Sequence, residues 1–215
     1  LIILVVVILT NERSATIMFV FSLIVFHFFN IQKFLNKIVV IFIISLSVLI
    51  ILSTNSKFKE HFITQPIKYF KDNHYRAHYL TGISIFNNNK ILGSGMKTFR
   101  IECSNKKYEN IKSKYYKNRC ATHPHNIYIE FLSDSGLLGF SFLLSLNFLI
   151  IKYLFFYRKK ILQKREKYIL FCQYLILFWP LQTTGAFFST WNGFFYWLFF
   201  AYFFSFLRVT TFKPN

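Results

Sequence analysis

Long runs of apolar residues, separated by short polar or basic segments, constrain this chain more than any other feature. The runs occupy residues 1–10, 14–29, 38–53, 137–157, 168–181 and 193–207. A helix of about 20 apolar residues crosses the hydrocarbon core of a bilayer and satisfies its own backbone hydrogen bonds there. The sequence therefore predicts an all-α fold, a polytopic transmembrane helical bundle. Hydrophobic residues make up 54% of the 215 residues, which excludes an ordinary soluble domain.

The basic segments orient these helices, because short loops rich in Lys and Arg stay in the cytoplasm whereas long loops are exempt from this rule. The segment 158–167 holds six basic residues and one acidic residue, so we expect it inside. Alternation then places the other short basic segments inside as well. The predicted organisation is transmembrane helices over 1–54 with an outer turn at 11–13, a periplasmic loop over 55–125, transmembrane helices over 126–208 with a cytoplasmic loop at 158–167, and a cytoplasmic tail over 209–215.

The chain begins at Leu1, inside an apolar run that has no basic n-region and no small-residue cleavage site. This pattern argues against a signal peptide. We expect the sequence to be the C-terminal part of a longer polytopic protein, with its opening helix cut short.

A formal net charge of +18 is compatible with nucleic acid or anionic lipid as a partner. The basic residues comprise 19 Lys and only 7 Arg in a background rich in Ile, Asn and Phe, which indicates compositional bias for most lysines. The lysines are also scattered rather than arranged with aromatic residues, so we predict membrane lipids and no nucleic acid as partners. Each Arg is then more informative, since its planar guanidinium grips phosphate with two hydrogen bonds.

The predicted loop 55–125 is long for a passive connection and holds 14 basic and 4 acidic residues, a balance of +10. Within it we expect a short interfacial helix over 79–86, turns at 87–89 and 93–95, and a solvated excursion over 105–118. Long loops of this kind commonly carry function.

Two of the three cysteines, Cys103 and Cys120, lie in this loop, whereas Cys172 lies in an apolar run. In an oxidising compartment such as a periplasm, the first two can form a disulfide. Free thiols are the alternative, and the sequence leaves both open.

Residues 121–130 place two imidazoles, those of His123 and His125, where the polar loop meets the next predicted membrane helix. Histidine is the usual side chain for moving a proton near neutral pH. Since proline favours the first turn of a helix, Pro124 predicts that His123 is a cap-like residue and His125 the second position of a helix. The positive end of the helix dipole would then disfavour the imidazolium form of His125. The alternative is that both are ordinary interfacial histidines.

The His-x-His pair does not predict a metal site. No nearby carboxylate or thiol cluster completes a coordination shell, and Cys120 alone is a weak third ligand. The glycines of segment 93–98 differ in spacing from those of a phosphate-binding loop. We therefore predict no metal and no cofactor.

Two arginines fall on the same predicted face of the membrane as the histidines. Arg13 lies in the turn 11–13 beside the end of a span, where a charge is normally functional, and Arg76 lies in the long loop. The alternative for Arg13 is an interfacial anchor that extends to water. We expect Arg13, Arg76 and His125 to line one outward-facing pocket.

In chain order these segments resemble the O-antigen ligase and polymerase family. Residues 11–15 are similar to the family's Glu-Arg-Ser-Ala turn, and Arg76 with residues 91–95 is similar to its Arg…Leu-Gly-x-Gly segment. Residues 123–139 are similar to its His-Asn-x-Tyr-Leu…Gly-Leu-Leu-Gly signature. The family's tryptophan a few positions after the loop arginine is absent, since Tyr and Leu stand at 79–80.

The resemblance implies a GT-C-like membrane glycosyltransferase of the bacterial inner membrane, with its active site facing the periplasm. It implies metal-independent, inverting transfer of a glycan from a polyprenyl diphosphate carrier to an acceptor hydroxyl. His125 would be the general base, Arg13 and Arg76 would bind the diphosphate, and His123 and Asn126 would be secondary contacts. The acceptor stays open among a lipid A core, a growing glycan and a protein, so ligase, polymerase and protein O-glycosyltransferase are alternatives.

A transporter component that binds lipid-linked glycan without making a bond is the alternative from another class. Such a protein would use the same arginines for binding alone. The predicted spans contain few charges that could line a path, which counts against transport.

Overall fold

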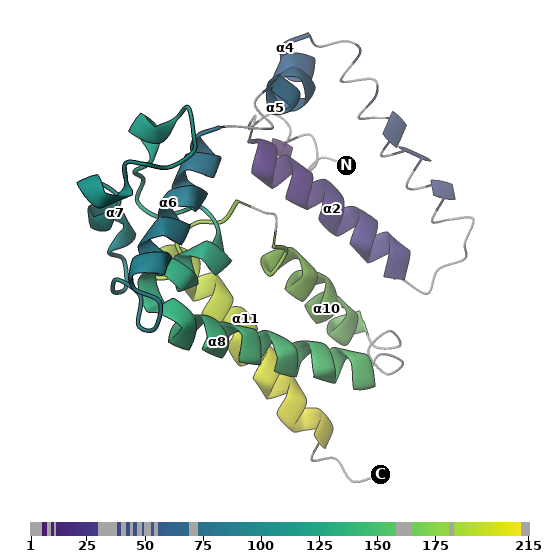
Figure 1. The fold of residues 1–215 in the computed structure, drawn as a ribbon. Helices are drawn as coiled ribbons and strands as arrows, with labels where there is room; N and C mark the ends of the chain where they lie inside the picture. The colour runs from purple at the N-terminus through teal and green to yellow at the C-terminus, as the bar shows by residue number, and fades with distance from the viewer. Residues whose placement is uncertain are drawn as a thin grey trace. The chain divides into compact units, whose positions relative to one another are not determined.

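A computed structural model describes residues 12–29, 56–68, 73–157, 165–180 and 183–211, together with isolated positions between 6 and 53. These residues form helices and no strand, so the all-α prediction is confirmed for the described part of the chain. The elements are α2 (Arg13–Phe29), α4 (Ser56–Lys59), the π-helix η1 (Glu60–Thr64), α5 (Gln65–Lys68), α6 (His74–Asn88), α7 (Phe99–Glu102), the 3₁₀ turns η2 (Lys106–Tyr108) and η3 (Tyr116–Asn118), α8 (Ile127–Phe156), α10 (Arg165–Leu177) and α11 (Thr190–Thr211) (Figure 1).

The chain divides into two units. The first comprises Leu1–Lys71 and Leu154–Phe178, and the second comprises Asp72–Tyr153 and Trp179–Asn215. In the first unit α2 packs against α10, with Val25 and Cys172 buried between apolar neighbours. The predicted segments 30–37, 158–164 and 212–215, and half of the predicted span 38–53, lie outside the described residues.

One helix in the described ranges, α8, is both long enough and apolar enough to cross a membrane. Arg13–Val25 in α2 is apolar but shorter. The arrangement of several spans around a periplasmic loop therefore stays a prediction.

The apolar part of α8 begins at a break, because Gly136 has non-helical backbone angles (φ 62°, ψ −160°). A helix that restarts leaves the N–H groups of its first turn without partners in the helix. The turn after α6 supplies those partners: the Leu137 N–H donates to the Lys90 carbonyl (2.8 Å) and the Leu138 N–H donates to the Ile91 carbonyl (3.2 Å). The turn 90–97 thus caps the membrane-length portion of α8.

Two glycines allow this approach of backbone to backbone. A Cβ on Gly136 would lie 2.5 Å from the Gly93 nitrogen, and a Cβ on Gly93 would overlap the backbone of Asp134. Both glycines have positive φ. The Ser94 N–H also donates to the Ser133 carbonyl (2.9 Å). We call this close contact between the turn 90–97 and the break at Gly136 the interlock.

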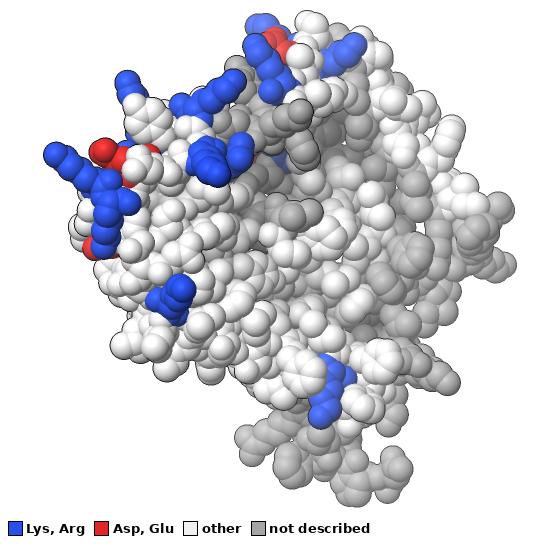
Figure 2. Space-filling model, in the orientation of Figure 1, with Lys and Arg blue, Asp and Glu red and all other residues white. Residues whose placement is uncertain are grey.

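The segment between α7 and α8 folds against α6, so the prediction of a solvated excursion over 105–118 was wrong in part. Its Tyr108 is 1% exposed and packs with Ile85, Phe99 and Cys103. The lysines of this region are exposed, and Figure 2 shows basic side chains gathered over the part of the surface formed around α6 and α7. The sequence mixes both kinds of residue without a period, so burial of the tyrosine could not be predicted.

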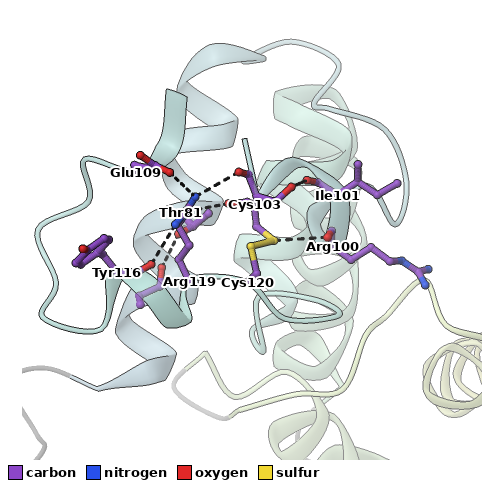
Figure 3. The surroundings of a disulfide bond; sticks show 10 residues. Thr81, Arg100, Ile101, Cys103, Glu109, Tyr116, Arg119 and Cys120 are labelled. Carbon is purple, nitrogen blue, oxygen red and sulfur yellow. Dashed lines mark hydrogen bonds and ion pairs between the residues drawn. A yellow bond between two sulfur atoms is a disulfide. The ribbon is translucent and has the colours of Figure 1, made fainter. Parts of the chain in front are cut away.

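A disulfide joins Cys103 to Cys120, whose Cα atoms lie 5.2 Å apart (Figure 3). The neighbouring Arg119 is buried and uses its guanidinium to satisfy backbone carbonyls: Nε donates to Cys103 (2.9 Å), and the two terminal nitrogens donate to Ser104 (3.3 Å) and Tyr116 (3.4 Å). A cross-link closing a loop of this length stabilises a fold by about 3 kcal/mol. The histidine segment starts directly after it.

Replacing Gly136 with Ala should destabilise the protein, because Ala must adopt a positive φ and its Cβ would meet the backbone of Gly93. We expect a loss of about 2 kcal/mol or more, seen as a lower melting temperature of the purified protein. Ser141→Ala, at an exposed position of the same helix, is the matched control and should change stability by less than about 0.5 kcal/mol. Superimposable melting curves for Gly136→Ala and wild type would contradict the interlock.

Candidate functional site

The N-terminus of α6 brings a cation and aromatic rings together in the second unit. Asn73 caps the helix, since its side-chain oxygen accepts from the Arg76 N–H at 2.8 Å. His74, Tyr75 and Arg76 therefore occupy the first turn, and His78 lies one turn further. Because unpaired N–H groups make this end of a helix positive, the guanidinium of Arg76 adds to a potential that already favours anions.

Asn126 caps α8: its side-chain oxygen accepts from the N–H groups of Tyr128 (3.0 Å) and Ile129 (3.2 Å). The prediction that His123 caps this helix and that His125 lies within it was therefore wrong. His125 precedes the helix and has a left-handed backbone conformation (φ 58°). The physical reason is that asparagine is among the strongest N-cap residues and outweighs the preference of proline for the first turn.

Hydrogen bonds to the chain before α11 hold the histidine segment. The Thr184 N–H donates to the His125 carbonyl, and His123 Nε2 lies 2.9 Å from the Thr184 carbonyl. The Asn126 side-chain amide donates to the Pro180 carbonyl (2.9 Å). A carbonyl can only accept, so His123 carries a proton on Nε2 in this arrangement.

Glu130 ties the same two segments together one helical turn below. Its carboxylate is buried, and Oε2 accepts from the Phe187 N–H at 2.8 Å. A buried carboxylate needs such a partner to offset desolvation. The acidic residue of the 121–130 segment is thus a structural link between α8 and the chain before α11.

His125 lies at the centre of a cluster of rings, which we call the imidazole cluster: His78, His123 and His125, with Tyr75 at its edge. The ring of His125 has its centroid 4.2 Å from that of His123 and 5.2 Å from that of His78. The Tyr75 ring meets His125 edge-on at 5.3 Å. Tyr75 and His78 are three residues apart, so one face of α6 presents both.

Sequence reasoning missed His78. The predicted interfacial helix began at residue 79, whereas α6 begins at His74, so the 75/78 spacing on a helix face went unrecognised. His78 is buried, and its Nδ1 has no hydrogen-bond partner among the described residues. A helix start placed at the Asn73 cap would have revealed the spacing.

Burial, together with repulsion between a charged His125 and the neighbouring His123 and His78, lowers the pKa of His125 to about 4. Burial also lowers the pKa values of His78 and His123. The expected cause, a helix dipole acting on His125, is replaced by desolvation and like-charge repulsion. The consequence is the same: the ring is neutral at pH 7 and can accept a proton.

Arg13 lies in the first unit, where two side chains orient its guanidinium. Its Nε donates to His61 Nε2 (3.1 Å), and Nη2 donates to Gln65 Oε1 (3.0 Å). The structure thus groups Arg76, His123, His125 and Asn126 in one unit and describes Arg13 in the other. The single pocket predicted for Arg13, Arg76 and His125 stays a prediction.

Among the residues that the structure describes, no group of three or more His, Cys, Asp or Glu side chains is arranged to hold a metal ion. The chemistry that the imidazole cluster offers is proton transfer and contact with an anion. A neutral ring can accept a proton from a hydroxyl, and a protonated one can pair with phosphate.

A family model described as O-antigen ligase matches residues 1–144, that is 144 of the 215 residues. No curated protein and no solved structure matches the chain. The matched range includes Arg13, Arg76 and the histidine segment.

His125 should contribute stability that is lost as the pH falls from 6.5 to about 4. In this interval an unfolded chain protonates the histidine while folded His125 stays neutral, so at this residue the unfolded state binds more protons, which gives stability a positive slope against pH. The buried carboxyl groups of Glu130 and Asp134, whose pKa values are raised, act in the opposite direction in both proteins compared below. His125→Asn should remove the contribution of His125 without straining the backbone, since asparagine tolerates the left-handed conformation. The change in melting temperature between pH 6.5 and about pH 5, measured for both proteins, provides the comparison. Equal changes in wild type and variant would contradict the buried, neutral His125.

Proposed function

Because the chain belongs to the O-antigen ligase family, we propose that it transfers a glycan from a polyprenyl diphosphate carrier to an acceptor hydroxyl at the outer face of the bacterial inner membrane. The observation that carries the proposal is the neutral, half-buried imidazole of His125 beside the positive end of α6. A glycan transferase of this kind needs a proton acceptor next to an anion site, and the contact of His125 with Tyr75 in the first turn of α6 supports this pairing.

In the proposed reaction, His125 removes the proton of the acceptor hydroxyl, and the hydroxyl oxygen attacks the anomeric carbon of the donor glycan. The bond between that carbon and the diphosphate oxygen breaks, and the carrier diphosphate leaves with the electron pair. Attack opposite to the leaving group inverts the sugar carbon. A positioned general base contributes about 10²- to 10⁴-fold to such a step.

A pKa of about 4 makes His125 a weak base before the donor binds. A bound diphosphate would raise this pKa, because a nearby anion stabilises the imidazolium. The donor substrate would therefore strengthen the base that acts on its own transfer. Without the donor, the cluster would stay neutral and would not trap protons.

Arg76 is the proposed diphosphate ligand of the second unit. It lies in the first turn of α6, two residues before His78, and its planar guanidinium suits two-pronged contact with phosphate oxygens. Arg13 is proposed as a second ligand, with His61 and Gln65 fixing the direction of its guanidinium. Both cations would stabilise the charge that develops on the leaving group.

His123 and Asn126 act in this proposal through His125. The amide of Asn126 is engaged by the α8 cap and by Pro180, and His123 is held by Thr184. Both residues therefore position the base. Lipid A core, a growing glycan and a protein all offer an acceptor hydroxyl, so ligase, polymerase and protein O-glycosyltransferase share this mechanism. A transporter of lipid-linked glycan would need no proton acceptor.

His125→Asn in the intact natural protein should lower glycan transfer at least about 100-fold, because it removes the base and keeps the backbone conformation. His123→Asn, which removes only a neighbour, should have a smaller effect. Acceptor-linked and carrier-linked glycan are both measured in membranes with equal amounts of each variant. Wild-type yield of acceptor-linked glycan from His125→Asn would exclude His125 as the base.

A further inference from the structure

The turn 90–97 carries large apolar side chains on its outside. Ile91 is 71% exposed, and Leu92 and Met96 are each 70% exposed. Moving one such side chain from water into an apolar environment is favourable by about 1.5–3 kcal/mol. Three of them within six residues form a patch of the kind that marks an interaction surface.

This patch is continuous with the apolar surface of α8. Leu137 and Leu138, the first residues after the break at Gly136, donate their N–H groups to Lys90 and Ile91. Leu138 is 65% exposed, and Leu137 is also exposed. The turn therefore lies at the end of the one described helix that is long and apolar enough to cross a membrane.

Basic residues flank the apolar tip. Lys90 and Lys97 stand at the two ends of the turn, Arg100 follows in α7, and all three are exposed. The carboxylate that meets the turn is that of Asp134, which is buried and accepts the backbone N–H of Lys97. Apolar side chains bordered by lysine and arginine are typical of segments that lie in the interface of an anionic membrane.

We propose that the turn 90–97 is an interfacial anchor that inserts Ile91, Leu92 and Met96 into the bilayer leaflet at the N-terminal end of the apolar part of α8. Lys90, Lys97 and Arg100 then contact the phosphates of anionic lipid headgroups. This anchor does not depend on the proposed glycan transfer. Since α6 leads directly into the turn, the anchor sets the depth of the C-terminal end of α6 relative to the headgroups.

Spin labels test the depth of the turn. Leu92→Cys and Met96→Cys, each in a Cys172→Ala background, are labelled with a nitroxide in the full chain, reconstituted in nanodiscs that contain phosphatidylglycerol. Cys103 and Cys120 are joined to each other and leave the new thiol as the target. Lys117→Cys, an exposed position in η3, is the matched control. Power saturation compares collisions with oxygen, which enters lipid, and with a nickel chelate, which stays in water.

Labels at 92 and 96 should show a several-fold higher ratio of oxygen to nickel accessibility than the label at 117. Replacing phosphatidylglycerol with phosphatidylcholine should lower that ratio, because the basic residues lose their partners. A nickel accessibility at 92 and 96 equal to that at 117 would place the turn in water and overturn the proposal. An immobilised label shielded from both reagents would mean that protein covers the turn, which also overturns it. The melting temperature of each labelled variant is measured to show that it is folded. Because two positions are labelled, the test still holds if one variant misfolds.

Discussion

The backbone hydrogen bond from the Thr184 N–H to the His125 carbonyl (2.9 Å) holds the residue on which the candidate site depends. His125 and Lys97 are the non-glycine residues with positive φ in the described ranges, and this conformation costs about 1–2 kcal/mol. The chain bears that cost only where its surroundings fix the conformation. Here the segment before α11 does so, and the side chain of His125 is directed into the imidazole cluster rather than along the axis of α8.

The other constraints on the site also act at helix ends. Asn73 and Asn126 cap α6 and α8 with side-chain oxygens, while the carbonyls of Lys90 and Ile91 cap the restarted helix after Gly136. Each device satisfies N–H groups that would otherwise lack partners and fixes the direction in which a helix leaves. The disulfide and the buried Arg119 hold the chain directly before the histidine segment. Hydrogen bonds to Thr184, before α11, then position the histidines.

Local pattern was sufficient to predict the helical class, the extent of α2 and the apolar helix that follows Gly136. The segments resembling a family were recognised because they combine charged, aromatic and glycine residues at fixed spacings, and the family model matches the same region. The glycines of two of these segments prove to interlock, which no single segment reveals. The bond from the Asn126 amide to Pro180, the burial of Tyr108 and the carbonyl-binding role of Arg119 all depend on partners distant in sequence. His78 was missed for the same reason, since its importance comes from its contact with His125, 47 positions later.

The electrostatic character of the site follows from the burial of its three imidazoles, and at His125 also from repulsion by His123 and His78. The central claim is that His125 is neutral before the donor binds, and that a bound diphosphate raises its pKa while leaving the ring able to accept a proton. Solid-state ¹⁵N NMR of histidine-labelled protein over a series of pH values, with His125 assigned by comparison with His125→Asn, measures this pKa directly. We expect a neutral His125 at about pH 6 without donor, and a higher pKa that still leaves the ring neutral at pH 7 with polyprenyl diphosphate glycan bound. A ring that is already protonated at about pH 6 without donor, or a pKa that the donor does not raise, would contradict the account.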